Sequence, residues 1–195
     1  AGSDISEFET LRTPDNAHAY DDAEADAHES IEKSPVPTIA MINGPCRGGG
    51  LAIALACDLR YASDTATFAA PPAKLGIAFP HPAVKALAKT IGDAHARYLL
   101  LTATTIDAKE ASRIGLLHHV TSSSSLTTTV AELTAQICKL APQSLTAAKV
   151  SLAAVKSHTS STEVQNAIKK CYESDDYQEG ITAFLEKRSP DFNGT

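Results

Sequence analysis

The chain has 195 residues, 43% of them hydrophobic, and a formal net charge of −6. That length suits one domain with a sizeable core, and an acidic chain without a lysine–arginine cluster is a poor surface for nucleic acid. The four cysteines show neither disulfide nor zinc spacing, and no apolar run is long enough to cross a membrane, so free thiols in a reducing compartment such as the cytoplasm are expected.

The predicted elements begin with strands that alternate with helices and end with helices only. Apolar runs, capping residues and Gly or Pro breaks set their boundaries. Strands are predicted over residues 38–42, 58–62, 67–68 and 117–120. Helices are predicted over residues 5–12, 15–32, 50–56, 82–90, 93–101, 108–114, 130–140, 142–156, 163–174 and 177–187. This succession indicates an α/β core followed by an all-helical part.

Particular residues mark the ends of two predicted segments in the middle of the chain. Asp107 is the expected N-cap of the helix over residues 108–114, and Gly115 is the glycine expected just beyond its end. The serine- and threonine-rich tract over residues 121–129 is predicted to be a loop that leads into the next helix.

The most informative segment is Gly48-Gly49-Gly50, which follows a predicted strand and precedes the apolar run Leu51–Cys57. Glycines lack a Cβ, so a ligand can approach their amides closely. The first amides of a helix have no intrahelical partner and lie at the positive end of its dipole, which favours a negatively charged oxygen. The segment has neither the Lys-Ser or Lys-Thr pair of a phosphate loop nor the spacing of a dinucleotide site. A tight strand-to-helix joint without a ligand is the alternative.

Further motifs follow one another along nearly the whole chain. They are Ala1–Ile5, Pro37–Gly44, Cys57–Ala62, Phe68, Lys74–Ile77, Leu100–Ala103 with Ala108 and Ala111, Gly115–Leu117 and Gly180–Arg188. Together with the three glycines, they resemble the crotonase family, also called the enoyl-CoA hydratase/isomerase superfamily. The ending over residues 172–194 looks most like the methylmalonyl-CoA decarboxylases of that family.

This resemblance implies a crotonase-type ββα spiral core over residues 1–120 and a helical trimerisation region over residues 121–195. It also implies assembly as a homotrimer or hexamer. Family members carry strands ahead of the motif that opens this chain, so a processed or incomplete chain is expected.

The resemblance further implies an acyl-CoA thioester as ligand, whose carbonyl oxygen is held by the backbone N–H groups of Ser3 and Gly49. Such donors stabilise the enolate or tetrahedral oxyanion of hydration, isomerisation, decarboxylation and thioester hydrolysis alike. Coenzyme A then enters as part of the substrate, and neither a separate cofactor nor a metal ion is expected. The other residues expected to bind substrate are Gly2, Asp4, Ile5, Arg47, Gly48 and Phe79.

Several of these residues have a second interpretation. Arg47 suits a substrate carboxylate but equally a solvated turn, and Asp4 can instead cap the helix that follows it. Phe184 and Lys187 match family positions that contact the coenzyme A of a neighbouring subunit. The alternative for that pair is an ordinary amphipathic helix, with Phe184 in the core and Lys187 in solvent.

The chain departs from the family pattern where acid–base chemistry is concerned. Hydratases of the family carry two glutamates at positions that are Ala52 and Pro72 here. Hydration needs one group to activate water and another to deliver a proton, so decarboxylation, isomerisation or hydrolysis is favoured over hydration. His81, in the loop before a predicted helix, is the candidate acid or base, or simply an exposed loop histidine. A catalytically silent acyl-CoA-binding or assembly protein of the same fold is the alternative function.

Overall fold

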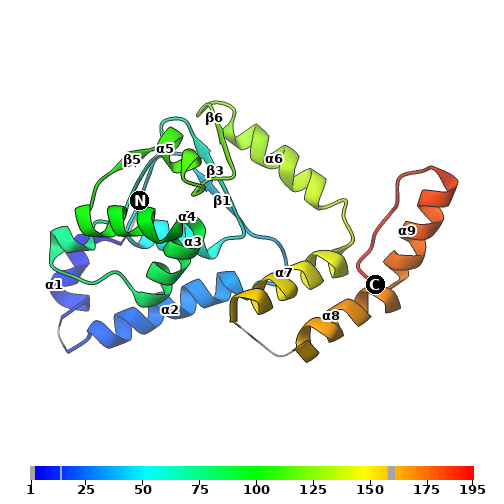
Figure 1. Ribbon diagram of the computed structural model, residues 1–195, viewed down its shortest axis with the longest axis horizontal. Helices are drawn as coiled ribbons and strands as arrows, with labels where there is room; N and C mark the ends of the chain where they lie inside the picture. The colour runs from blue at the N-terminus through cyan, green and yellow to red at the C-terminus, as the bar shows by residue number, and fades with distance from the viewer. Residues whose placement is uncertain (1–2, 14, 158–160) are drawn as a thin grey trace. The chain divides into compact units, whose positions relative to one another are not determined.

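The computed structural model describes residues 3–13, 15–157 and 161–195. These residues form two compact units, one comprising residues up to 34 together with 38–130, and the other comprising residues 35–37 and 131–195 (Figure 1). The first unit contains both sheets and the second is helical. The α/β class predicted from the sequence is therefore confirmed. The two units part at residue 130, whereas the sequence places the start of the helical region at residue 121.

Two small sheets organise the first unit. One sheet has the order β1-β3-β6 and is parallel throughout, and the other has the order β2-β4-β5, with an antiparallel last pair. Their bounds are β1 Ile39–Ile42, β3 Leu59–Ser63 and β6 His119–Thr121 in the first sheet, and β2 Pro45–Arg47, β4 Thr67–Ala69 and β5 Ile106–Asp107 in the second. The register aligns Ile39 with Leu59 and Cys46 with Phe68.

Helices make up the rest of this unit. They are η1 Ile5–Glu7, α1 Phe8–Leu11, α2 Ala17–Glu32, α3 Gly49–Ala56, η2 Pro72–Leu75, α4 His81–Thr102 and α5 Ala108–Arg113, and α6 Leu126–Ile137 then leads into the second unit. Of these, α3 and α5 pack against the sheets. Asp107 accepts the amide of Glu110, which confirms the predicted cap of α5. Gly115 has a φ of +81°, as the glycine after a helix requires. The sequence predicts two helices, over residues 82–90 and 93–101, and α4 does consist of two helical parts that meet at a kink, where Gly92 has non-helical φ and ψ angles of +79° and 157°.

Two stretches of this unit differ from what the sequence predicts. No strand is predicted between residues 43 and 47, yet Pro45–Arg47 forms β2 because it pairs with the distant β4. The loop expected over residues 121–129 ends early, since α6 already begins at Leu126. Leu126 is buried, so this residue contributes an apolar side chain where only a polar tract was expected.

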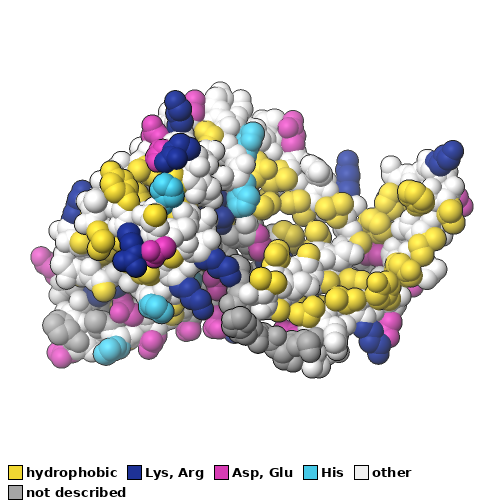
Figure 2. Space-filling view, viewed as in Figure 1, with side chains coloured by type: hydrophobic (Ala, Val, Ile, Leu, Met, Phe, Trp, Pro, Cys, Tyr) yellow, Lys and Arg dark blue, Asp and Glu magenta, His cyan; other side chains and the backbone are white. Residues whose placement is uncertain are grey.

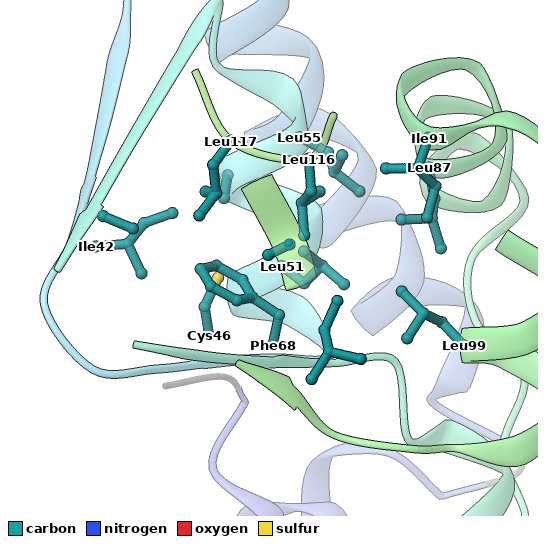
Figure 3. Close-up of a cluster of buried hydrophobic side chains, with 14 of the residues drawn as sticks. Ile42, Cys46, Leu51, Leu55, Phe68, Leu87, Ile91, Leu99, Leu116 and Leu117 are labelled. Carbon is teal, nitrogen blue, oxygen red and sulfur yellow. The ribbon is translucent and has the colours of Figure 1, made fainter. Parts of the chain in front are cut away.

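The core of the first unit surrounds α3. Leu51, Phe68, Leu87 and Leu116 are fully buried, and Figure 3 shows side chains of α4 on one side of this cluster and Ile42 on the other. Nearly every residue of α3 is apolar, which predicts a helix buried on most of its surface. Burial of this kind, at about 25 cal/mol per Å² of apolar surface, fixes where the first turn of α3 lies.

A buried arginine closes the other end of α3. The guanidinium of Arg60 donates to the carbonyls of Cys57 at 2.9 Å and Leu116 at 2.8 Å. Burial lowers the pKa of Arg60, while the nearby Cys57 and Asp58 act in the opposite direction. The bond to Cys57 satisfies a carbonyl at the end of α3, where helical carbonyls lack intrahelical partners, and the bond to Leu116 joins this end to the segment before β6.

The second unit is built from α7 Pro142–Ser157, α8 Ser161–Glu173 and α9 Asp175–Glu186. α9 begins two residues earlier than predicted because Ser174 caps it by accepting the amide of Tyr177. The last residues fold back on α9, where buried Asp176 accepts the amides of Asn193 and Gly194. Over the described residues, no helix is long and apolar enough to span a membrane.

Candidate active site

A cavity of about 280 Å³ opens in the first unit, where the N-terminal residues, the end of β2 and the start of α3 meet the segment over residues 71–80. Most of its wall is apolar. The apolar lining residues are Ile5, Phe8, Ala52, Pro71, Pro72, Leu75, Ile77, Ala78, Phe79 and Pro80. The rest of the lining comes from Ser3, Arg12, Glu24, Arg47, Gly48 and Gly49. An apolar cavity with a few convergent polar groups is the usual form of a small-molecule site.

The β2–β4 pair decides which glycine amide faces this cavity. The amide of Gly48 donates to the carbonyl of Ala69 at 3.1 Å and so continues the ladder between the two strands. Gly48 has a φ of +51° and a ψ of −119°, a conformation that only glycine adopts readily. The chain then enters α3, whose first helical bond runs from the amide of Ala52 to the carbonyl of Gly48. Gly49 is therefore the first amide beyond the ladder, at the positive end of α3.

Ser3 and Glu24 meet beside Gly49. The hydroxyl of Ser3 donates to Oε1 of Glu24 at 3.2 Å. A Cβ placed on Gly49 would lie 3.0 Å from the Ser3 hydroxyl, 3.4 Å from Oε1 of Glu24 and 3.7 Å from the Ser3 amide nitrogen. Only a glycine leaves this space open. The amides of Ser3 and Gly49 thus lie at the same end of the cavity, with a carboxylate next to them.

Arg12 forms another part of the wall and is fixed by three contacts. Its guanidinium lies 5.2 Å from the ring centre of Phe8 and 4.9 Å from that of Tyr20, and it donates to Asp21 at 2.6 Å. The side chain of Arg12 is only 11% exposed. The paired carboxylate compensates the charge of Arg12, so this residue acts chiefly as a rigid wall between α1 and α2.

Most of the residues predicted to bind substrate line this cavity: Ser3, Ile5, Arg47, Gly48, Gly49 and Phe79. Asp4 does not. Its carboxylate accepts the hydroxyl of Ser6 at 2.7 Å and its amide at 2.9 Å, and these bonds lower the pKa of Asp4. Asp4 is therefore the N-cap of η1, as the alternative interpretation had it. Gly2 lies outside the described residues.

His81 is exposed at the first position of α4, and the lining stops one residue earlier, at Pro80. Its role as acid or base stays a prediction. Ala52 and Pro72, by contrast, are both buried and both line the cavity. The two positions that carry glutamates in hydratases thus face the same space here, without a carboxylate on either.

The sequence analysis missed Glu24 and Arg12. Both lie in the N-terminal helical part of the chain, where acidic residues are frequent and no spacing marks one of them as facing a cavity. α2 packs against α3, and this tertiary contact brings Glu24 to Gly49. No one-dimensional signal in the chain identifies it. Among the described residues, no group of three His, Cys, Asp or Glu side chains is arranged to hold a metal ion.

A larger hollow, of about 640 Å³, lies in the second unit. Its lining is mostly apolar, and two of its polar residues, Ser174 and Asp176, form the structural hydrogen bonds described above. Phe184 also lines it and is 83% exposed, so this side chain is not in the core. Lys187 follows as the residue that ends α9, with a left-handed backbone. Contact of Phe184 and Lys187 with coenzyme A stays a prediction.

Comparison with known proteins gives a consistent result. A family model described as enoyl-CoA hydratase/isomerase matches residues 1–195. An enoyl-CoA isomerase/hydratase of Mycosarcoma maydis is 37% identical over 174 residues, which cover 85% of this chain and 62% of that protein. The methylmalonyl-CoA decarboxylase of Escherichia coli K12 is 32% identical over 200 residues, which cover 100% of this chain and 76% of that protein.

A crystal structure of a putative enoyl-CoA hydratase/isomerase family protein from Hyphomonas neptunium superposes with a TM-score of 0.95 at 32% identity. That match covers 100% of this chain and 76% of the solved one. The chain therefore spans 62% to 76% of the length of these three proteins.

Proposed function

The chain belongs to the enoyl-CoA hydratase/isomerase family of acyl-CoA-processing enzymes and has the crotonase fold, and on that premise we propose that it catalyses an enolate- or oxyanion-forming reaction of an acyl-CoA thioester. Isomerisation, decarboxylation and thioester hydrolysis are the reactions proposed, and hydration is not. Coenzyme A takes part as the leaving or carrying group of the substrate.

One observation carries this proposal: the amides of Ser3 and Gly49 lie together at one end of a mostly apolar cavity. The thioester oxygen accepts both amides, and the positive end of α3 adds to the stabilisation as negative charge develops on that oxygen. Because most of the surrounding wall is apolar, each of these interactions is stronger than it would be in bulk water. Removing one such donor typically costs about 10²- to 10³-fold in rate.

The preference against hydration follows from the cavity wall. Ala52 and Pro72 line the cavity, and neither side chain can take up or deliver a proton. Adding water across a double bond needs both operations at once. Reactions that need only charge stabilisation, or one proton-transferring group, are compatible with this wall.

The same two residues favour a second candidate function, a crotonase-fold protein that binds acyl-CoA without turning it over. In that case the amides of Ser3 and Gly49 hold a thioester whose reaction does not proceed. The two candidates predict equal binding and differ only in turnover.

We also propose that the second unit binds further copies of the chain, as trimers or hexamers. Large apolar side chains gather over its helices (Figure 2), among them Phe184 at 83% exposure and Leu185 at 73%. Water contact with so much apolar surface is unfavourable, and such patches commonly mark interfaces. Light scattering after gel filtration should give a multiple of the chain mass for the full-length protein, and a smaller species for Leu185→Ser.

The experiment that tests the proposed function is a mass-spectrometric assay of a small acyl-CoA panel with the full-length protein. The panel contains a 2-enoyl, a 3-enoyl, a malonyl-type and a saturated thioester, and calorimetry measures the binding of each. Conversion of the 3-enoyl, malonyl-type or saturated thioester supports the enzyme. Efficient hydration of the 2-enoyl thioester contradicts the preference stated above, and binding without conversion supports the second candidate.

A further inference from the structure

Glu24 is a carboxylate at the reaction end of the cavity, in a place where the sequence gives no reason to expect one. Glu24 is the only acidic residue among the described residues that line the cavity. Its Oε1 atom lies within reach of both the Ser3 hydroxyl and the space in front of Gly49. It comes from α2, whereas the positions that lack a carboxylate, Ala52 and Pro72, lie on α3 and η2. The cavity is therefore supplied with an acidic group from a different wall.

The carboxylate of Glu24 is held in place by a hydrogen bond and has no ion pair among the described residues. Over the described residues no ion pair involves Glu24, whereas its neighbour on the same helix, Asp21, is paired with Arg12. Among the described residues, the side chain of Glu24 accepts one hydrogen bond, at Oε1, and Oε2 accepts none. The side chain is partly buried, and its hydrogen bond to Ser3 restricts where the carboxylate can lie. A group that is held in place, but not neutralised by a cation, meets the requirements of a general base.

We propose that Glu24 is the proton-transferring group of this site and that it catalyses a 1,3-proton transfer within a 3-enoyl thioester. This proposal rests on the proposed function. In the first step, the Glu24 carboxylate takes a proton from C2, the C2–H bond breaks, and its electron pair moves toward the thioester oxygen. The dienolate so formed is held by the amides of Ser3 and Gly49. In the second step, the Glu24 carboxyl returns the proton to C4, and the double bond moves from C3–C4 to C2–C3.

The atoms and electrons of this reaction balance without a further reactant. Substrate and product are isomers, Glu24 ends as the carboxylate with which it began, and water takes no part. One carboxylate is sufficient because the same group removes and returns the proton. Hydration needs two groups acting together, and loss of carbon dioxide from a malonyl-type substrate would bring a second negative charge toward Glu24. The position of this single carboxylate thus selects among the reactions proposed above.

The test compares Glu24→Gln with Glu32→Gln, an exposed glutamate at the end of the same helix. Three quantities are measured on the full-length protein: conversion of a 3-enoyl-CoA to the 2-enoyl isomer, exchange of substrate C–H for deuterium in heavy water, and acyl-CoA binding by calorimetry. Glu24→Gln should lower isomerisation and exchange by about 10²- to 10⁴-fold and leave binding within about threefold of wild type. Glu32→Gln should match the wild type in all three. Glu24→Asp, which keeps the charge but shortens the side chain, should fall between them.

The outcomes separate the two proposals. Isomerisation by Glu24→Gln at the wild-type rate overturns the role of Glu24, and so does a loss confined to His81→Ala. An equal loss in Glu32→Gln also overturns it, because the effect would then come from the helix and not from the site. If the wild-type protein neither binds nor converts any acyl-CoA, the proposed function itself is overturned.

Discussion

Replacing Gly49 by alanine should strongly reduce turnover while leaving the fold intact. The new methyl group would lie 3.0 Å from the Ser3 hydroxyl and 3.4 Å from Oε1 of Glu24, so it would fill the space that the thioester oxygen needs. The hydroxyl can rotate away, at the cost of its hydrogen bond to Glu24, which is worth about 1 kcal/mol. Alanine is favoured over glycine in a helix by up to about 1 kcal/mol. These two effects nearly cancel, so the free energy of unfolding should change by less than about 1 kcal/mol.

The effect on catalysis is much larger. Blocking the approach to one oxyanion donor should lower kcat/KM by about 10²- to 10³-fold, or roughly 3 to 4 kcal/mol. Turnover of the substrate found in the acyl-CoA panel is measured by mass spectrometry, and stability by urea unfolding. Gly44→Ala is the matched control, because nothing lies within 4 Å of a Cβ there and its backbone is not left-handed. Wild-type turnover by Gly49→Ala would refute the assignment of this amide to the oxyanion site.

Gly48→Ala should affect stability, whereas Gly49→Ala should affect turnover. A Cβ on Gly48 meets no atom within 4 Å, yet its φ of +51° is one that alanine adopts only under strain. The variant should therefore lose about 1 to 3 kcal/mol of stability. If Gly48→Ala unfolds at the same urea concentration as the wild type, the backbone of this turn is not as described.

Three other predictions concern the scaffold. Arg60→Leu should lower the free energy of unfolding by roughly 2 to 4 kcal/mol, as measured in urea, because buried carbonyls at the end of α3 and before β6 lose their donor. A change of less than about 1 kcal/mol would contradict this prediction. The ion pair with Arg188 lowers the pKa of Glu179 to about 2 from its usual value of 4.5. The stabilisation of the protein by this pair should therefore be complete above pH 4.5 and be lost as the pH falls toward 2. The difference in unfolding free energy between wild type and Glu179→Gln should shrink over that interval. Burial raises the pKa of Cys46 to about 11, so maleimide should label exposed Cys138 in the native protein and reach Cys46 only after denaturation.

The sequence predicts those parts of the fold that local patterns determine. A continuous apolar run marks β1, and a capping aspartate with a following glycine marks α5. β2 escapes such a pattern, because its three residues contain a proline and precede three glycines. It is a strand only because Cys46 pairs with Phe68, a contact between segments that are far apart in the chain. Pairing of this kind follows from tertiary structure and not from propensity.

The site divides in the same way. The sequence itself marks Gly49 as a candidate backbone donor, through glycines where a side chain would obstruct a ligand and a helix start directly behind them. Ser3 is predicted only through the resemblance to the crotonase family. Glu24 leaves no such trace. It is one of several acidic residues on α2, and its relation to Gly49 depends on how two helices pack, which no spacing along the chain encodes.

This difference has a consequence for how chemistry changes within one fold. The proposed oxyanion donors belong to the backbone, and the position of the Gly49 amide is tied to β2, β4 and the start of α3, so it cannot change without disturbing the core. A proton-transferring carboxylate has no such tie, because any side chain on the cavity wall can supply it. In this chain the wall contributed by α3 and η2 carries Ala52 and Pro72, and the wall contributed by α2 carries Glu24. In the proposed mechanism, the stabilised enolate meets its acid–base group from a different direction, and the carbon atom that this group reaches determines which product forms.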